Sequence, residues 1–539
     1  MMSTNKVWLS HYPEYIAKEL LIPEKTIPEM FNETVENYPN HSCLSFYGKR
    51  NTYKEVHSAV MSFASALQKN EVQKGDRVAI MLPNCPQYII SYYGILTVGG
   101  IVTQINPMSV ERELMELLND SGAETIVVLN IFYPIVNSIM DETSLRKIIV
   151  VNLADTEESG DSCITFEKFL KSGDQDVIPV MIDSNEDVAI LQYTGGTTGR
   201  SKGVMLTHRN LYANIMQQSE FFKGAFDPGR ERVLSIIPFF HVYGMNVCIN
   251  LSVFMANEII MLPRFEIQEV LNTIKNEQPT LFPGVPTMYV ALINHPESEK
   301  YDIDAIKLCN SGSAPMPVEL MKQFENKTGA TILEGYGLSE ASPTTHSNPA
   351  FAKRKPGTVG IPYPSTDSKI VDLATGINEV PVGEIGELII KGPQVMKGYW
   401  NLPEETANTL RDGWLYTGDI ASVDEDGYVT ILDRKKDMII ASGFNVYPRE
   451  IEEVIYEHPC VKEAVVIGVP DTYRGETVKA VIVLKEGNHL TLEEMKEYCK
   501  SKLATYKVPR MIEFRNELPK TNVGKILRRA IRETESSIK

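Results

Sequence analysis

The sequence predicts an α/β protein in which a large N-terminal body of doubly covered sheets, plus a small β unit, precedes a small α+β C-terminal domain. First, strand-like apolar runs alternate with helical patterns over most of the chain. This alternation is typical of parallel sheets with helices on both faces. Second, the alternation stops near Pro381. Third, 539 residues are too many for one compact core, so we expect several structural units.

The N-terminal half of the body begins with three short apolar runs, which we expect to be strands at 77–82, 100–103 and 125–129. Between them, apolar residues recur three and four positions apart at 88–96 and 111–118. That period predicts helices. The segment is therefore expected to form part of a parallel sheet.

The centre of the sequence is a loop rich in glycine and hydroxyl residues, which follows a buried strand expected at 187–191. It contains Thr194, Gly195, Gly196, Thr197, Thr198, Gly199, Ser201, Lys202 and Gly203. Glycine lets the backbone approach a ligand closely. Backbone N–H groups, hydroxyls and a lysine bind phosphate oxygens. The composition predicts a loop that holds a polyphosphate.

The spacing in this loop differs from two common nucleotide-binding motifs. Lys202 is separated from Gly199 by Arg200 and Ser201, whereas a Walker loop has glycine, lysine and a hydroxyl residue in succession. The dinucleotide pattern G-x-G-x-x-G is also absent from this loop. A flexible surface loop is the alternative interpretation. Its place directly after a buried strand, where α/β sheets bind ligands, favours a binding loop.

The alternation resumes after the loop. We expect a helix at 208–216, then strands at 258–262 and 306–310, each followed by a helix, at 267–275 and 318–324. The body should therefore contain a second parallel sheet.

The regular alternation of expected strands and helices ends in the last third of the chain. Strands expected at 384–390 and 427–432 resemble a small antiparallel unit, and a charged run at 433–437 follows. Beyond it, the pattern predicts helices at 450–457 and 492–503 and strands near 465–467 and 478–484. The charged run is interpreted as the boundary between a body, 1–433, and a C-terminal domain, 434–539. An ordinary loop is the alternative.

Composition limits the possible partners and the compartment. The net charge of −17 argues against nucleic acid, which needs a basic surface. The seven cysteines are scattered without a C-x-x-C pair, which argues against zinc and for a reducing, cytoplasmic environment.

The N-terminus lacks the apolar core of a signal peptide. The most apolar stretch, 233–262, is interrupted by polar residues, so we expect no membrane-spanning helix. Peripheral membrane contact stays open.

Four later segments combine residues that could bind a nucleotide. Tyr336, Ser339 and Glu340 are expected on one tight turn after a strand. There Tyr336 could stack on a base and Glu340 could bind magnesium, although a plain turn would have the same composition. Asp419 could accept the ribose hydroxyls or merely cap a strand. Lys525 lies on a short loop beside a glycine, where a solvated lysine is the usual case. His241 has aromatic neighbours, as a buried core histidine also would.

Together these segments resemble the adenylate-forming enzymes, which include acyl-CoA synthetases, firefly luciferase and the adenylation domains of peptide synthetases. The matching segments are YTGGTTGRSKG from Tyr193, EGYGLSE from Glu334, GWLYTGD from Gly413, LDRKKDMIIASGFNVYPREIE from Leu432 and PKTNVGK from Pro519. They follow the order and spacing of the family from about Thr26 to the C-terminus. Within the family the chain looks most like bacterial long-chain fatty-acid–CoA ligases.

The resemblance implies a two-step reaction with ATP, Mg²⁺ and CoA. A medium- or long-chain carboxylate attacks the α-phosphate of ATP, which gives acyl-AMP and diphosphate. The thiol of CoA then attacks acyl-AMP, which gives the thioester and AMP. Three alternatives stay open: loading of a separate carrier protein, ligation of another carboxylic acid, and nucleotide binding without catalysis.

The resemblance also implies roles for individual residues. It assigns nucleotide contacts to Thr194, Gly195, Gly196, Thr197, Thr198, Gly199, Lys202, Gly312, Ser313, Ala314, Glu334, Gly335, Tyr336, Gly337, Ser339, Asp419 and Arg434. Ser339 stands where threonine is commoner and keeps the hydroxyl. Glu340 and Thr198 would bind Mg²⁺. Lys525 would bridge the substrate carboxylate and the α-phosphate, and His241 would lie between the carboxylate and the acyl chain.

The same resemblance implies that the C-terminal domain is mobile. Lys436 would be the hinge about which it rotates between the two steps, and Gly443 would line the tunnel for the pantetheine arm of CoA. We expect the acyl chain to lie against 242–254 and 283–289. The sequence predicts neither the chain length of the acid nor the oligomeric state.

Overall fold

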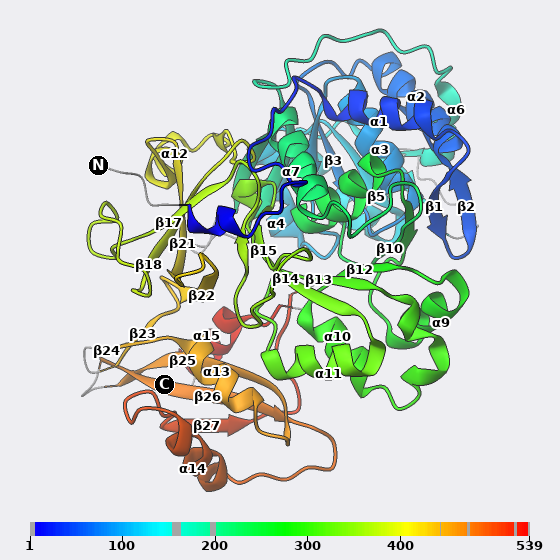
Figure 1. Cartoon of the computed structure of the whole chain (residues 1–539). Helices are drawn as coiled ribbons and strands as arrows, with labels where there is room; N and C mark the ends of the chain where they lie inside the picture. The colour runs from blue at the N-terminus through cyan, green and yellow to red at the C-terminus, as the bar shows by residue number, and fades with distance from the viewer. Residues whose placement is uncertain are drawn as a thin grey trace.

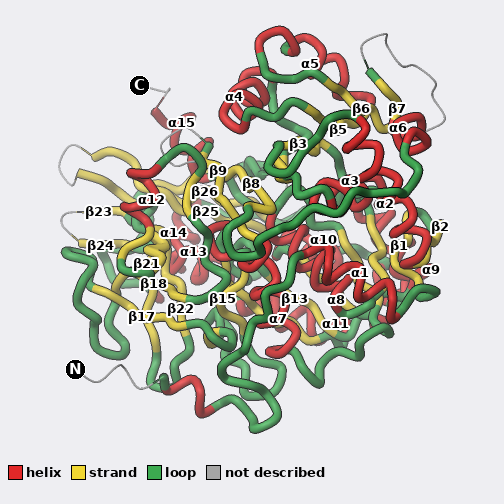
Figure 2. The backbone as a smooth tube through the Cα atoms, turned by 90° about the horizontal axis from the view of Figure 1, so that it is seen from above, coloured by secondary structure: helices red, strands yellow, loops and turns green. Residues whose placement is uncertain are grey.

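A computed structural model describes residues 6–153, 163–194, 201–441, 444–471, 475–521 and 525–536 (Figure 1). Within these ranges the strands form four sheets. Two large sheets form the body, and a small antiparallel sheet and a C-terminal sheet follow. Figures 1 and 2 both show the last two on the side of the molecule opposite the hairpin of β1 (Ser42–Phe46) and β2 (Lys49–Thr52).

The first large sheet has the order β19-β9-β8-β4-β3-β5-β6-β7 and is parallel from β8 to β7. Its strands are β3 (Arg77–Met81), β4 (Ile101–Gln104), β5 (Thr125–Leu129), β6 (Lys147–Val151), β7 (Ile164–Thr165), β8 (Val188–Thr194), β9 (Lys202–Thr207) and β19 (Gly398–Tyr399). The accompanying helices are α2 (Tyr53–Lys69), α3 (Pro86–Thr97), α4 (Glu111–Ser121), α5 (Tyr133–Ser138) and α6 (Phe166–Ser172). On β3, Val78 and Ile80 join one hydrophobic core, and Ala79 and Met81 join another. The sheet is therefore covered on both faces, as predicted.

The second large sheet has the order β16-β15-β14-β13-β12-β10-β11-β1-β2 and is parallel from β14 to β1. Its further strands are β10 (Arg232–Ser235), β11 (Glu258–Met261), β12 (Leu281–Gly284), β13 (Leu308–Ser311), β14 (Thr331–Gly337), β15 (Thr344–Ser347) and β16 (Ile361–Pro362). Its helices are α1 (Ile27–Asn37), α7 (His208–Phe221), α8 (Ser252–Phe254), α9 (Ile267–Glu277), α10 (Pro286–Asn294) and α11 (Val318–Thr328).

The apolar stretch 233–262 forms buried structure within this sheet. It runs from β10 through a π-helical segment, Gly244–Leu251, and α8 to β11. In the described part of the chain, no helix combines the length and the apolar character needed to cross a membrane.

The small β unit is antiparallel, as predicted. It contains β17 (Asp367–Val371), β18 (Gly386–Lys391), β20 (Leu410–Arg411), β21 (Trp414–Val423) and β22 (Val429–Arg434), with α12 (Pro403–Thr409) beside it.

The chain leaves this sheet at a turn over residues 435–437 and enters the C-terminal sheet. That unit contains β23 (Ile439–Ala441), β24 (Phe444–Val446), β25 (Val461–Asp471), β26 (Gly475–Leu484), β27 (Met511–Phe514), α13 (Pro448–Tyr456), α14 (Leu492–Lys502) and α15 (Arg528–Ser536). One face of its sheet has a core of its own, which includes Ile451, Val466 and Met495. The sheet and the core change at the charged run that the sequence marks. The domain limits themselves stay a prediction.

Several strands were not predicted, and β9 is the one that changes the description of the site. The strand expected at 187–191 extends to Thr194, and β9 pairs with it antiparallel before α7 begins at His208. The glycine-rich loop therefore joins two strands of a hairpin. The residues of β9 belong partly to the loop motif, so their strand pattern is too short to recognise.

Candidate active site

The phosphate loop is anchored by its two flanking strands. Thr194 and Lys202 are paired at the end of the β8–β9 hairpin. The Nζ atom of Lys202 lies 2.5 Å from Oε2 of Glu405 on α12 and 5.1 Å from the centre of the Tyr399 ring. The predicted contacts Gly195, Gly196, Thr197, Thr198 and Gly199 lie outside the described residues.

Tyr399 connects this lysine to the predicted metal ligand. Its hydroxyl donates to Oε1 of Glu340 at 2.8 Å. Mg²⁺ in nucleotide sites is usually held by one or two carboxylates and by substrate phosphates. The carboxylate of Glu340, close to the loop lysine, fits that requirement. Among the described residues, no group of three or more His, Cys, Asp or Glu side chains could hold a metal ion. Thr198, the second predicted ligand, lies outside the described residues.

The glycines of β14 and of the segment after β13 allow these segments to pack closely against neighbouring parts of the protein. A side chain at Gly337 would clash with the carbonyl oxygen of Pro343, at 2.2 Å. At Gly312 it would meet the Tyr243 ring at 3.3 Å, and Ser313 has a left-handed backbone with φ of 64°. Close backbone approach of this kind is what glycine permits. Ala314 follows directly in the sequence, as does Ser339 after β14.

Tyr336 lies on β14, not on the tight turn that we expected after a strand. Its register partner is His346 on β15, and the two rings meet edge to face at 5.9 Å. Its hydroxyl donates to Oδ2 of Asp419 at 2.5 Å. Gly335 precedes it, with Asn310 next to the glycine. The strand thus fixes both the plane of the ring and the position of its hydroxyl.

Asp419 lies in the middle of β21, whereas we expected the end of a strand. Its register partner on β22 is Arg434, whose Nε lies 3.6 Å from Oδ1 of Asp419. Burial raises the pKa of Asp419, and the charge of Arg434 opposes this rise. The pairing of β21 with β22 shifts register between Ile420 and Ala421, directly after Asp419.

Lys525 reaches this cluster from the C-terminal unit. Burial lowers its pKa to about 7; Arg434 acts in the same direction, and Asp419 opposes it. Its backbone N–H donates to Oγ1 of Thr521 at 3.1 Å. The structure therefore brings Lys525, Asp419 and Arg434 together, although they come from separate motifs.

His241 faces the same lysine. Burial lowers its pKa to about 4, and the charge of Lys525 adds to the effect. The backbone N–H of Tyr243 donates to Nδ1 of His241 at 3.2 Å. The neutral ring therefore carries its proton on Nε2, where it can donate to a ligand.

Glu334 differs from the other predicted contacts because it binds the C-terminal unit. Its side chain is 2% exposed, and its Oε1 lies 3.5 Å from Nη2 of Arg449 on α13. Burial raises its pKa to about 7 against the opposing charge of Arg449. No pattern in the sequence predicts this contact.

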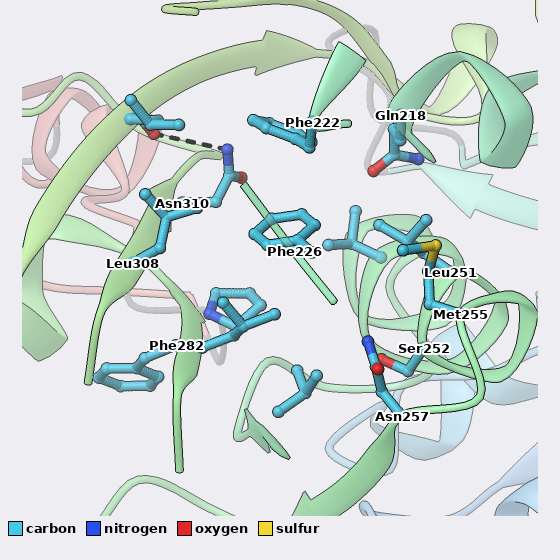
Figure 3. A pocket seen from close by; sticks show the side chains of 15 residues that line it. Gln218, Phe222, Phe226, Leu251, Ser252, Met255, Asn257, Phe282, Leu308 and Asn310 are labelled. Atoms are coloured by element: carbon cyan, nitrogen blue, oxygen red, sulfur yellow. Dashed lines mark hydrogen bonds between the residues drawn. The ribbon is translucent and has the colours of Figure 1, made fainter. Parts of the chain in front are cut away.

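An apolar cavity lies between the second large sheet and the π-helical segment (Figure 3). Val247, Leu251 and Pro283 come from the two ranges where we expected the acyl chain. Figure 3 shows Phe226 pointing towards the middle, with Phe282 on the opposite side from Leu251 and Met255. The strand and loop residues Phe222, Phe226, Leu308 and Leu333 were not anticipated.

The cavity lies close to the nucleotide motifs. Asn310 lines it, and its Oδ1 accepts a hydrogen bond from the hydroxyl of Tyr243 at 2.9 Å. The ring of the same tyrosine borders Gly312. An acid bound in the cavity could therefore present its carboxylate near the phosphate site.

The model of the family described as AMP-binding enzyme matches residues 31–400, and that of its C-terminal domain matches residues 450–525. The chain belongs to the AMP-binding enzyme family. It is 48% identical to the long-chain-fatty-acid–CoA ligase of Bacillus subtilis (strain 168), over 99% of each chain. It is 36% identical to the feruloyl-CoA synthase of an Amycolatopsis species, over 92% of this chain and 96% of the relative. These findings confirm the predicted family and fold class, whereas the residue roles stay predictions.

A solved relative indicates which conformation the structure describes. ATP-bound MatB from Rhodopseudomonas palustris is 30% identical and has a TM-score of 0.86, over 95% of this chain and all of that one. The apo structure of MatB also matches over 95% of this chain and all of that one, but with a TM-score of 0.76. The described arrangement is nearer to the ATP-bound form.

Proposed function

We propose that the protein is a long-chain-fatty-acid–CoA ligase that converts a fatty acid, ATP and CoA to acyl-CoA, AMP and diphosphate through an acyl-adenylate. The observation that carries the proposal is the position of Lys525. This lysine of the C-terminal unit interacts electrostatically with Asp419 on β21, with Arg434 at the end of β22 and with His241. A cation there can neutralise two anions, the carboxylate and the α-phosphate, that must approach each other.

In the first step the fatty-acid carboxylate attacks the α-phosphate and diphosphate leaves. Lys525 bridges the attacking oxygen and a phosphate oxygen, because charge increases there in the transition state. Lys202 and the loop orient the leaving diphosphate. Asp419 and Arg434 hold the ribose, and Tyr336 stacks on the adenine. Mg²⁺ held by Glu340 would neutralise phosphate charge.

The acid is positioned by neutral groups. With a pKa of about 4, His241 is uncharged at pH 7, so it donates a hydrogen bond from Nε2 without adding charge. The apolar cavity takes the acyl chain, and each buried methylene contributes about 0.8 kcal/mol. Long chains are therefore favoured over acetate.

In the second step the CoA thiol attacks the acyl carbonyl and AMP leaves. Lys525 must withdraw to let the thiol approach, so the unit after residue 433 rotates about the turn that contains Lys436. The difference between the ATP-bound and apo relatives supports such a rotation. Gly443, proposed to line the path of CoA, lies outside the described residues.

The test is incubation of the purified protein with ATP, Mg²⁺, CoA and a panel of acids from acetate to long-chain fatty acids. We expect AMP, diphosphate and acyl-CoA in equal amounts, with the highest kcat/KM for medium or long chains. Diphosphate release without thioester would indicate a carrier protein as the acceptor. No release with any acid would contradict the proposal.

An aromatic acid is a second candidate substrate. The relative named feruloyl-CoA synthase and the phenylalanines around the cavity favour it. Ferulate and benzoate therefore belong in the panel, and a preference for either would identify this second function.

A further inference from the structure

A buried ion pair joins the nucleotide strand of the body to the C-terminal unit. Glu334 lies on β14, two residues before Tyr336, and Arg449 lies in the first turn of α13. The closest atoms, Oε1 and Nη2, are 3.5 Å apart, and the two side chains are 2% and 9% exposed. Alternate residues of a strand point to the same face, so Glu334 and Tyr336 share one side of β14.

Arg449 has further partners in the body. Its Nη1 donates to the carbonyl oxygen of Ile431 on β22 at 2.6 Å, and its backbone N–H donates to Oδ2 of Asp433 at 3.2 Å. Glu334, Ile431 and Asp433 all precede the turn 435–437, whereas Arg449 follows it. A rotation about that turn must therefore break these contacts together.

Breaking the pair is unfavourable for the body. Oε1 of Glu334 also accepts a hydrogen bond from the backbone N–H of Met316 at 3.3 Å, but Oε2 has no hydrogen-bond partner among the described residues. Without Arg449, the carboxylate would stay buried and lose its cation. Such a loss is costly, because the desolvation of the charge is no longer compensated.

We propose that Arg449 is a positioning residue, whose ion pair with Glu334 holds the C-terminal unit in the orientation that presents Lys525 for the first step. The inference rests on the proposed two-step function. The new element is that the ion pair stabilises this orientation at β14, the strand that carries Tyr336. The orientation of the C-terminal unit and the proposed adenine site are therefore coupled. Arg449 itself touches no reacting atom in this assignment.

The test is Arg449→Met, with each half-reaction measured separately. Single-turnover diphosphate release from ATP and palmitate reports the first step. Thioester formation from supplied palmitoyl-AMP and CoA reports the second. We expect the first rate to fall about 100-fold, as for the loss of one partner of a buried pair. The second rate should stay the same or rise, because the competing orientation is weakened.

The matched control is Arg354→Met. Arg354 also pairs with a glutamate and a carbonyl, Glu325 at 2.5 Å and Ile332 at 2.7 Å, but all three belong to the body. Its loss should change both half-reactions by the same factor. A selective loss of the first step in this control would overturn the inference.

A double variant covers the case in which Arg449→Met does not fold. In Glu334→Gln with Arg449→Met, no buried charge is left unpaired, and such replacements often keep a protein stable. A folded double variant should still lose the first step selectively. Equal loss in both steps, or no loss, would overturn the positioning role. If the unchanged protein made no acyl-AMP, the proposed function would fail instead.

Discussion

The charge state of Lys525 should make the first half-reaction fall as the pH rises. The pKa of this lysine is lowered from 10.5 to about 7, first by burial and then by Arg434. Only the protonated amine can bridge a carboxylate and a phosphate. About half of the molecules carry that charge at pH 7 and about one in a hundred at pH 9, so kcat/KM for diphosphate release should fall about 50-fold.

The assay is diphosphate release at low fatty-acid concentration between pH 7 and 9, where the phosphate groups are already ionised. Lys525→Arg is the control, because a guanidinium stays charged throughout this range. Its rate should be lower but independent of pH. A flat profile for the unchanged protein, or a parallel decline in the arginine variant, would refute the assigned role of the lysine charge.

Three further changes test other parts of the site. Lys525→Ala should raise the activation free energy of diphosphate release by about 3 to 4 kcal/mol, because the transition state loses one preorganised donor. Thioester formation from supplied acyl-AMP should keep its rate. Equal losses in both assays would contradict the role of the lysine. Lengthening the acid from acetate should raise kcat/KM, because each added methylene buried in the cavity stabilises the bound acid by at most about 0.8 kcal/mol. A maximum of kcat/KM at acetate in the substrate panel would argue against the cavity as the acyl site. Lys436→Pro fixes φ near −65° and removes an N–H, so it should allow one turnover of diphosphate release and then stall with bound acyl-AMP. Thioester formation at the normal rate would show that Lys436 is not the hinge.

Much of the body follows from local patterns. The strand expected at 125–129 is β5, and the helix expected at 267–275 is α9, which ends where Gln278 takes a left-handed conformation with φ of 49°. In both segments the spacing of apolar residues and the residues at the ends predict the same type of secondary structure. The π-helical segment Gly244–Leu251 carries no such signal, because all of its residues are buried. A segment that is buried all round has no need of an exposed polar face, so it lacks an amphipathic period.

The site residues that the sequence could not predict depend on tertiary contacts. Tyr399 reaches Glu340 and Lys202 because the short strand β19 pairs with β9, which is almost two hundred residues away. Arg449 lies on an ordinary amphipathic helix, and only the packing of the C-terminal unit brings it to Glu334. By contrast, the residues that the resemblance assigned to the ribose and lysine cluster do meet in the structure.

The neighbouring cations in that cluster oppose the protonation of Lys525 when no substrate is bound. Lys525 has its pKa lowered by burial, Arg434 and Arg528, and Lys436 has its own lowered by burial and Arg434. The charge of Lys525 also lowers the pKa of His241. Without an anion, then, these cations disfavour one another at close range. In the proposed reaction, ATP and a carboxylate offset that repulsion, and departure of diphosphate restores it. The negative charge that holds Lys525 in the site therefore decreases when diphosphate leaves, and this decrease favours withdrawal of the lysine before CoA attacks.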